Sequence, residues 1–135
     1  MKTAVIYWSG TGNTEMMAKA VAEGASADIF TVSEFGGNIA DYDRIAFGCP
    51  AMGAEVLEED EFEPFFTDAE NSLSGKTVAL FGSYGWGDGE WMRNWEERVK
   101  NSGAVLLDGE GFIVNETPSD DDLAKCREIG RELSK

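Results

Sequence analysis

The chain has 135 residues, of which 26 are acidic and 11 basic, and it carries a net charge of −15 with no histidine. A chain of this length forms one domain whose core needs no cross-links, and its acidity argues against nucleic acid and anionic membranes as partners. Without histidine, and with Cys49 and Cys126 as its only cysteines, it is not expected to bind zinc, another metal ion or an iron–sulfur cluster.

Apolar runs alternate with amphipathic stretches, which is typical of alternating strands and helices. In chain order they predict a strand at 3–8, a helix at 13–23, strands at 27–32 and 44–49, a helix at 64–73, a strand at 77–82, a helix with Trp91, Trp95 and Val99 on one face, a strand at 104–114 and a last helix after Ser119. The i, i+4 spacing of Trp91 and Trp95 places both in the core. Asp108–Gly111 interrupt the last strand, and a bulge is one interpretation of them.

Continuous apolar strands separated by helices predict a parallel sheet covered on both faces. With right-handed crossovers, the simplest closure is a doubly wound α/β fold, with a five-stranded sheet of order 2-1-3-4-5 between two layers of helices. Ligands of such sheets bind beyond the carboxyl ends of the strands, where the strand order reverses. The loops at 9–14, 50–60 and 83–90 are therefore expected to converge on one site.

The first of these loops, from Ser9 to Thr14, reads SGTGNT and opens onto a predicted helix. Backbone N–H groups at a helix N-terminus favour an anion, and glycines allow the chain to close around it. The loop lacks the lysine of a nucleotide-hydrolysing P-loop, and Glu15 stands where a dinucleotide fingerprint requires its third glycine. These exclusions leave a terminal phosphate that is bound but not cleaved, with a plain polar turn as the alternative.

Three segments resemble the flavodoxins of the short-chain type, and the resemblance extends over essentially the whole chain. They are WSGTGNT, CPAMGAEVLEEDEFEPFF and ALFGSYGWGDGEWM, in the order in which the family has them. The resemblance implies the flavodoxin-like three-layer sandwich and one FMN, bound tightly without a covalent link. It also implies a one-electron carrier of low potential, not an enzyme, in which FMN cycles between semiquinone and hydroquinone and no residue is catalytic.

The resemblance assigns the flavin ring to the second and third loops. Trp86 is expected to cover the outer face of the ring and Met52 the inner face, while Glu55 accepts a hydrogen bond from flavin N3–H. Gly53 permits a backbone carbonyl to rotate toward flavin N5, because the rotated turn needs a positive φ at its second residue. For Trp8, packing is an equal alternative. The residues expected at the cofactor are Trp8, Ser9, Gly10, Thr11, Gly12, Asn13, Thr14, Ala51, Met52, Gly53, Glu55, Ser83, Tyr84, Gly85, Trp86, Gly87 and Asp88.

The second and third loops also carry a set of carboxylates that we call the acidic rim. Its members are Glu55, Glu58, Glu59, Asp60, Glu61, Glu63, Asp88 and Glu90. Several negative charges near the flavin would lower its second one-electron potential by more than about 0.1 V, and they would steer a basic patch of a redox enzyme onto the flavin edge. Redox enzymes are therefore the expected partners. The chain itself is expected to be a monomer and to be cytoplasmic, because neither a signal peptide nor an apolar span is recognisable.

Two other functions remain open on the sequence. An FMN-dependent NAD(P)H:quinone-type oxidoreductase shares this fold, but it needs room over the ring that Trp86 is expected to fill. A passive FMN-binding module would need neither Gly53 nor the acidic rim. Cys49, at the end of a strand, and Cys126, on a helix face, are expected to be inert core residues.

Overall fold

The computed structural model describes residues 2–135. Its elements are β1 (Thr3–Tyr7), α1 (Asn13–Ala25), β2 (Asp28–Thr31), η1 (Ile39–Asp41), β3 (Arg44–Gly48), α2 (Phe62–Ala69), η2 (Glu70–Ser72), β4 (Thr77–Tyr84), α3 (Glu90–Asn101), β5 (Val105–Leu106), η3 (Leu107–Gly109), β6 (Phe112–Asn115) and α4 (Asp120–Leu133). The predicted helices and the first four predicted strands are confirmed, with ends that differ by a few residues. In this part of the chain, no helix combines the length and the apolar composition needed to cross a membrane.

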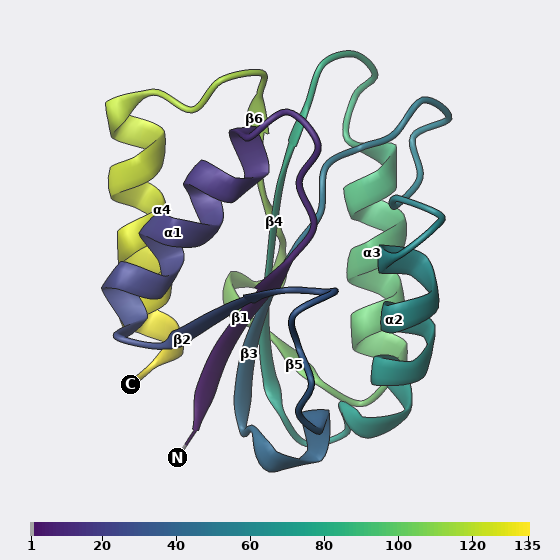
Figure 1. Ribbon diagram of the computed structural model, residues 1–135, viewed down its shortest axis with the longest axis vertical. Coiled ribbons are helices and arrows are strands. Elements are labelled where there is room, and N and C mark those ends of the chain that lie inside the picture. The colour runs from purple at the N-terminus through teal and green to yellow at the C-terminus, as the bar shows by residue number, and fades with distance from the viewer. Residues whose placement is uncertain (1) are drawn as a thin grey trace.

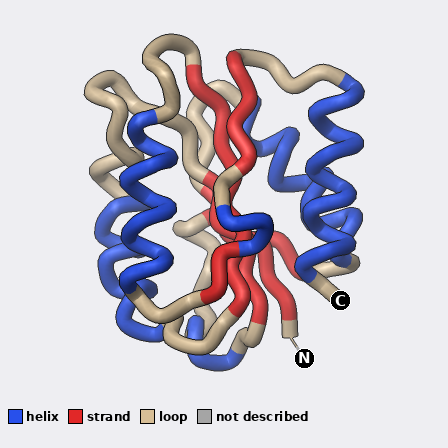
Figure 2. Tube along the Cα trace, turned by 180° about the vertical axis from the view of Figure 1, so that it is seen from behind, coloured by secondary structure: helices blue, strands red, loops and turns tan. Residues whose placement is uncertain are grey.

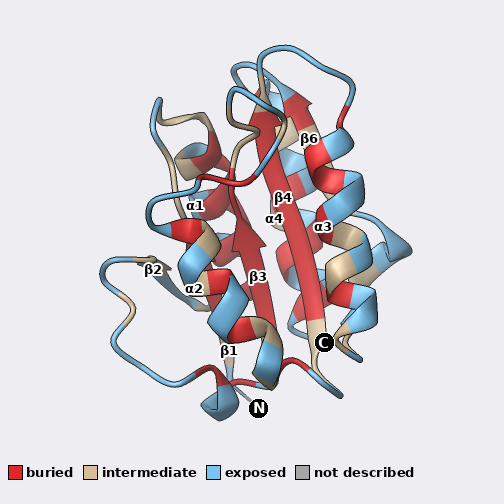
Figure 3. Cartoon of the chain, turned by 90° about the vertical axis from the view of Figure 1, so that its right-hand side faces the viewer, coloured by how far each residue is buried: buried red, intermediate tan, exposed pale blue. Residues whose placement is uncertain are grey.

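The strands run parallel in one sheet of order β2-β1-β3-β4-β5, and β6 also pairs with β4. Helices α1 and α4 cover one face of the sheet, and α2 and α3 cover the other (Figure 1). This arrangement confirms the predicted strand order and the two layers of helices. Because helices cover both faces, β3 and β4 are buried over most of their length (Figure 3), which explains their continuous apolar sequences.

The two faces of the sheet have cores of different composition. Between the sheet and the pair α2 and α3 lie large aromatic rings, among them Phe62 and Trp95, whose centroids are 5.4 Å apart in an edge-to-face contact. Trp91 and Trp95 are both buried in this core, as their spacing predicted. On the other face, α1 and α4 contribute mostly small and aliphatic side chains, together with Cys126.

Helices α1 and α4 approach each other so closely that main-chain atoms are in contact. A Cβ at Gly130 would collide with the carbonyl of Val21 and would lie 2.7 Å from the nitrogen of Ala25. We therefore expect Gly130→Ala to lower the free energy of unfolding by about 2 kcal/mol, because the helices must move apart. Urea unfolding measures this loss, and Gly36→Ala, where a Cβ meets no atom within 4 Å, is the matched control. Equal stabilities of the two variants would contradict the packing.

The last predicted strand is split into two. Both β5 and β6 pair with β4, and residues 107–111, which include η3, leave the sheet opposite Ala79 and Leu80 (Figure 2). A β-bulge adds a single residue, so this excursion is too large to be one, and the interpretation as a bulge is wrong. Asp108 adopts a φ of 62° within it, a conformation that aspartate tolerates better than most residues.

Both cysteines are buried and neither forms a disulfide. Burial raises the pKa of the Cys49 thiol, and it raises that of Cys126 to about 12. Neither side chain is therefore a thiolate at neutral pH, and a thiol is a weak nucleophile. These environments agree with the expectation that both are inert core residues.

Candidate functional site

The loops that follow β1, β3, β4 and β6 gather at one edge of the sheet (Figure 1). They surround a cavity of about 220 Å³, which we call the β4-side cavity. Its lining residues are Trp8, Gly10, Thr11, Asn13, Pro50, Ala51, Met52, Ser83, Tyr84, Gly85 and Glu116. The three loops that were expected to converge do so, and a fourth loop, between β6 and α4, joins them.

The first loop has the geometry of an anion site. Gly12 precedes α1 with a φ of 99°, a left-handed conformation that favours glycine. The hydroxyl of Ser9 accepts hydrogen bonds from the N–H groups of Gly12 and Glu15, each at 3.2 Å. The N–H groups of Thr11 and Asn13, at the positive end of the α1 dipole, donate to no acceptor within residues 2–135. An anion can therefore bind here without a lysine or an arginine.

The side chain of Thr14, at the start of α1, contacts β4. Its hydroxyl lies 3.0 Å from that of Ser83, and the N–H of Ser83 donates to Thr14 Oγ1 at 3.3 Å. Thr14 is 1% exposed and does not line the β4-side cavity, whereas Ser83 does. The pair links the first turn of α1 to β4 next to the site, and the Thr14 hydroxyl supports the first loop through Ser83.

The second loop forms a tight turn from Met52 to Glu55. The N–H of Glu55 donates to the carbonyl of Met52 at 2.7 Å, and the N–H of Met52 donates to that of Val56 at 2.9 Å. Glu55 has a positive φ of 53°, whereas Gly53 does not have a positive φ. The turn is therefore in the unrotated form. A Cβ at Gly53 would meet no atom within 4 Å, so this form does not itself require glycine.

Glu55 connects the second loop to the third. Its Oε1 accepts hydrogen bonds from the N–H groups of Gly89 and Glu90, each at 3.2 Å, at the start of α3. A carboxylate at this position is favoured by the α3 dipole. Its Oε2 accepts no hydrogen bond from residues 2–135 and remains available for a ligand. One carboxylate oxygen of Glu55 is therefore free to accept the expected hydrogen bond from flavin N3–H.

The third loop presents Trp86 to solvent, with 63% of its surface exposed. Gly85, the residue before it, lines the β4-side cavity, but Trp86, Gly87 and Asp88 do not. Gly87 has a φ of 88°, and a Cβ there would lie 2.5 Å from the carboxyl carbon of Glu55. The loop thus leaves a large aromatic ring mostly exposed, one residue after Gly85 in the wall of the cavity.

Glu58 has a different role from the one expected in the acidic rim. It is only 6% exposed, and its carboxylate accepts hydrogen bonds of 2.8 Å from the N–H groups of Asp60, Glu61 and Phe62. Burial alone would raise the pKa of Glu58, but the three N–H groups hold it below its usual value. The side chain therefore caps α2 and is not part of an exposed surface.

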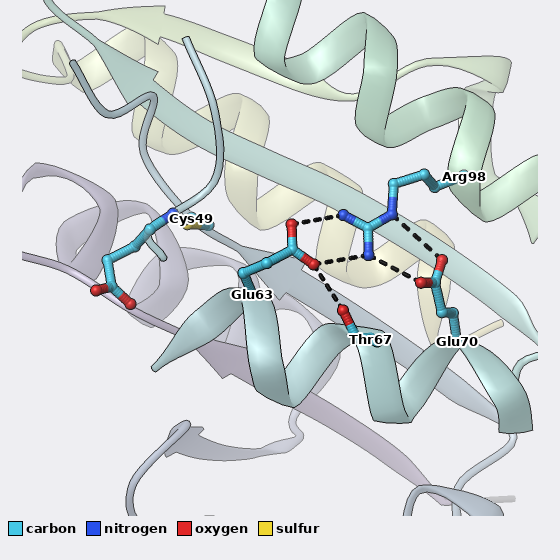
Figure 4. Close-up of polar contacts among 6 residues, drawn as sticks. Cys49, Glu63, Thr67, Glu70 and Arg98 are labelled. Carbon is cyan, nitrogen blue, oxygen red and sulfur yellow. Dashed lines mark hydrogen bonds and ion pairs between the residues drawn. The ribbon is translucent and has the colours of Figure 1, made fainter. Parts of the chain in front are cut away.

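Two further members of the acidic rim are paired with cations. Arg98 forms a bidentate pair with Glu63 and also binds Glu70, with nitrogen–oxygen distances from 2.8 to 3.3 Å, and Thr67 donates to Glu63 (Figure 4). Asp88 pairs with Arg93 at 2.9 Å. The exposed rim carboxylates that form no ion pair within residues 2–135 are Glu59, Asp60, Glu61 and Glu90.

Sequence reasoning missed Glu116 and Pro50 as lining residues. Glu116 has a φ of 59°, and its N–H donates to the carbonyl of Tyr84 at 2.7 Å, which brings the loop after β6 to the cavity. The predicted strand order contained this signal, because it places the last strand beside β4. The loop at 115–118 should therefore have been included among the converging loops.

These features fit the FMN that the sequence resemblance implies. The free N–H groups of Thr11 and Asn13 suit a phosphate, and the β4-side cavity, with Met52 and Tyr84 in its walls, suits a flat and partly apolar ring. Over the described range 2–135, no three His, Cys, Asp or Glu side chains are close enough to one another to hold a metal ion.

Comparisons with known proteins agree with this site. The family model described as Flavodoxin matches residues 5–130. The flavodoxin of Megasphaera elsdenii is 47% identical over 97% of this chain and 97% of its own length, and the flavodoxin of Clostridium beijerinckii is 46% identical over 96% and 97%. The solution structure of two-electron reduced Megasphaera elsdenii flavodoxin matches with a TM-score of 0.82 and 45% identity, covering 98% of each chain.

These matches extend over nearly the full length of both relatives, and they do not favour the NAD(P)H-dependent oxidoreductase that the sequence had left open. The relatives are electron-transfer proteins rather than enzymes. The fold, the loop geometry and the matches lead to one conclusion, that this chain belongs to the flavodoxin family, whose members bind FMN and carry electrons between redox partners.

Proposed function

We propose that this chain, as a single domain over residues 1–135, carries one electron at a time at low potential on one FMN that it binds without a covalent link. The main support is that the free N–H groups at the start of α1 adjoin the β4-side cavity, which Gly10 and Thr11 also line. Titration of the flavin-free protein with FMN should show one equivalent bound. A chain that binds no FMN would contradict the proposal.

FMN, when bound, accepts and returns electrons singly. We assign its phosphate to the N–H groups of the first loop and to the hydroxyl of Ser9. The ring is assigned to the β4-side cavity, with Met52 on its inner side and Tyr84 at its edge. Trp86 is assigned to the outer face, because a ring that is 63% exposed gains area by stacking on a flavin. Glu55 holds α3 through Oε1 and offers Oε2 to the pyrimidine edge.

The turn at Gly53 supplies a test of the proposed switch. In the unrotated turn a side chain at Gly53 fits freely, but the rotated turn requires a positive φ, which a β-branched residue resists. Gly53→Val should therefore bring the two one-electron potentials closer together, by about 0.05 V for a conformational cost of about 1 kcal/mol. A redox titration measures both potentials.

Ala54→Val is the matched control for this test, because residue 54 keeps a negative φ in both forms of the turn. It should leave the separation of the potentials as it is in the unmodified protein. An unchanged separation in Gly53→Val would show that rotation at Gly53 is not part of the switch.

We place the docking surface for a redox enzyme at the four unpaired rim carboxylates, Glu59, Asp60, Glu61 and Glu90. These carboxylates favour a partner that carries a basic patch, and the partner would bind the face that presents Trp86. The chain itself is proposed to be a cytoplasmic monomer. The rate of electron transfer should then fall as salt is added, because salt screens exposed charges. A rate that is independent of salt, or a dimer in light scattering, would contradict this arrangement.

A further inference from the structure

A second cavity lies on the other side of the first loop. We call it the β2-side cavity; it has a volume of about 440 Å³ and extends to residues 31–33, which end β2 and follow it. Trp8, Gly10 and Thr11 line both this cavity and the β4-side cavity. The loop assigned to the phosphate is therefore a wall between two cavities, of which the proposed function uses one.

Two carboxylates are held at the β2-side cavity by hydrogen bonds. Tyr7 donates through its hydroxyl to Glu15 Oε2 at 3.0 Å, and the indole N–H of Trp8 donates to Glu61 Oε1 at 3.1 Å. Burial and the neighbouring Glu15 carboxylate raise the pKa of Tyr7 to about 12, so its hydroxyl keeps the proton that it donates. The cavity is lined by no lysine or arginine of the described chain, 2–135. Its charge is therefore negative and uncompensated.

This negative charge affects the binding of flavin nucleotides that carry a second phosphate. FMN ends at a single phosphate, whereas FAD continues into a second phosphate and an adenosine. With the ring in the β4-side cavity and the first phosphate at the loop, the cavity adjoining the loop on its far side is the one lined by Glu15 and Glu61. A second phosphate there would meet two carboxylates and no cation.

We propose that Glu15, assisted by Glu61, makes this chain select FMN over FAD by opposing a second phosphate in the β2-side cavity. The inference rests on the proposed function, because it takes the first loop as the phosphate site. Two like charges roughly 6 Å apart at an effective dielectric near 40 oppose binding by about a factor of ten. The N–H of Glu15 also donates to the hydroxyl of Ser9, but this backbone bond does not depend on the side chain.

The test compares the dissociation constants of FMN and FAD for the flavin-free protein by titration calorimetry, after circular dichroism has confirmed that each variant is folded. Glu15→Gln keeps the shape of the side chain and removes its charge, so the ratio of the FAD constant to the FMN constant should fall about tenfold. The double variant Glu15→Gln/Glu61→Gln should lower the ratio further. Glu23→Gln, at an exposed position on the same helix, should leave it unchanged.

A purely structural role of Glu15 would change both dissociation constants together and leave their ratio constant. A ratio in the double variant within about twofold of that of the unmodified protein, with FMN still bound, would overturn this inference and leave the proposed function standing. If the unmodified protein binds no FMN, the proposed function fails, and the inference fails with it.

Discussion

Glu58→Ala is expected to lower the free energy of unfolding by about 3 kcal/mol, the largest loss that we predict for any single side chain here. The buried carboxylate accepts three N–H groups at the start of α2, and alanine would leave these donors without a partner. Urea unfolding measures the loss. Glu59→Ala, at the exposed neighbouring position, is the matched control and should stay within about 0.5 kcal/mol of the unmodified protein.

The same carboxylate makes stability depend on pH. Despite its burial, folding lowers the pKa of Glu58 below its ordinary value of 4.5. Its contribution to stability is therefore fully present above that value, and it is lost as the pH falls through the lower pKa of the folded protein. In Glu58→Gln, the free energy of unfolding should fall less steeply than in the unmodified protein as the pH is lowered through this acid range. An unaltered decline in this variant would show that the N–H groups do not hold the charged form.

Neutralising the four unpaired rim carboxylates together is expected to raise the second one-electron potential by about 0.1 V. The variant carries Gln at positions 59, 61 and 90 and Asn at position 60. Each removed charge no longer opposes the extra electron on the flavin, and four small effects add because the charges are exposed and act through solvent. A redox titration at low salt measures the shift, which should shrink at high salt.

The control for this variant has the same change in net charge at a distance from the site. Glu23 near the end of α1, Asp41 in η1, and Glu128 and Glu132 in the second half of α4 are exposed, and these segments lie toward the opposite end of the sheet from the loops of the site (Figure 1). Their amides should shift the second potential by much less than the rim variant does. Equal shifts in the two variants would mean that net charge, and not the position of the rim, sets the potential.

The sheet and its order were predictable because β1, β3 and β4 are buried on both faces, and burial on both faces leaves a continuous apolar run. The core positions of Trp91 and Trp95 followed from helical spacing in the same way. The start of α4 was predictable from Ser119, and in the structure the side chains of Ser119 and Asp122 accept hydrogen bonds from each other's backbone N–H groups in a capping box.

The parts of the site that sequence reasoning misjudged depend on how side chains are oriented within a loop. Composition placed Glu58 and Glu63 in an exposed acidic rim, but it could not show that one caps α2 and the other pairs with Arg98. Likewise, the SGTGNT motif shows which residues form the first loop, but not that the Thr14 hydroxyl turns to Ser83. Such contacts join residues that are far apart in the sequence.

We expect these loops to hold one FMN and to let it take up electrons singly. A potentiometric titration of the FMN-loaded protein, followed by flavin absorbance, tests this most directly. We expect two separate one-electron steps, the second at a strongly negative potential. A single two-electron step would contradict this expectation.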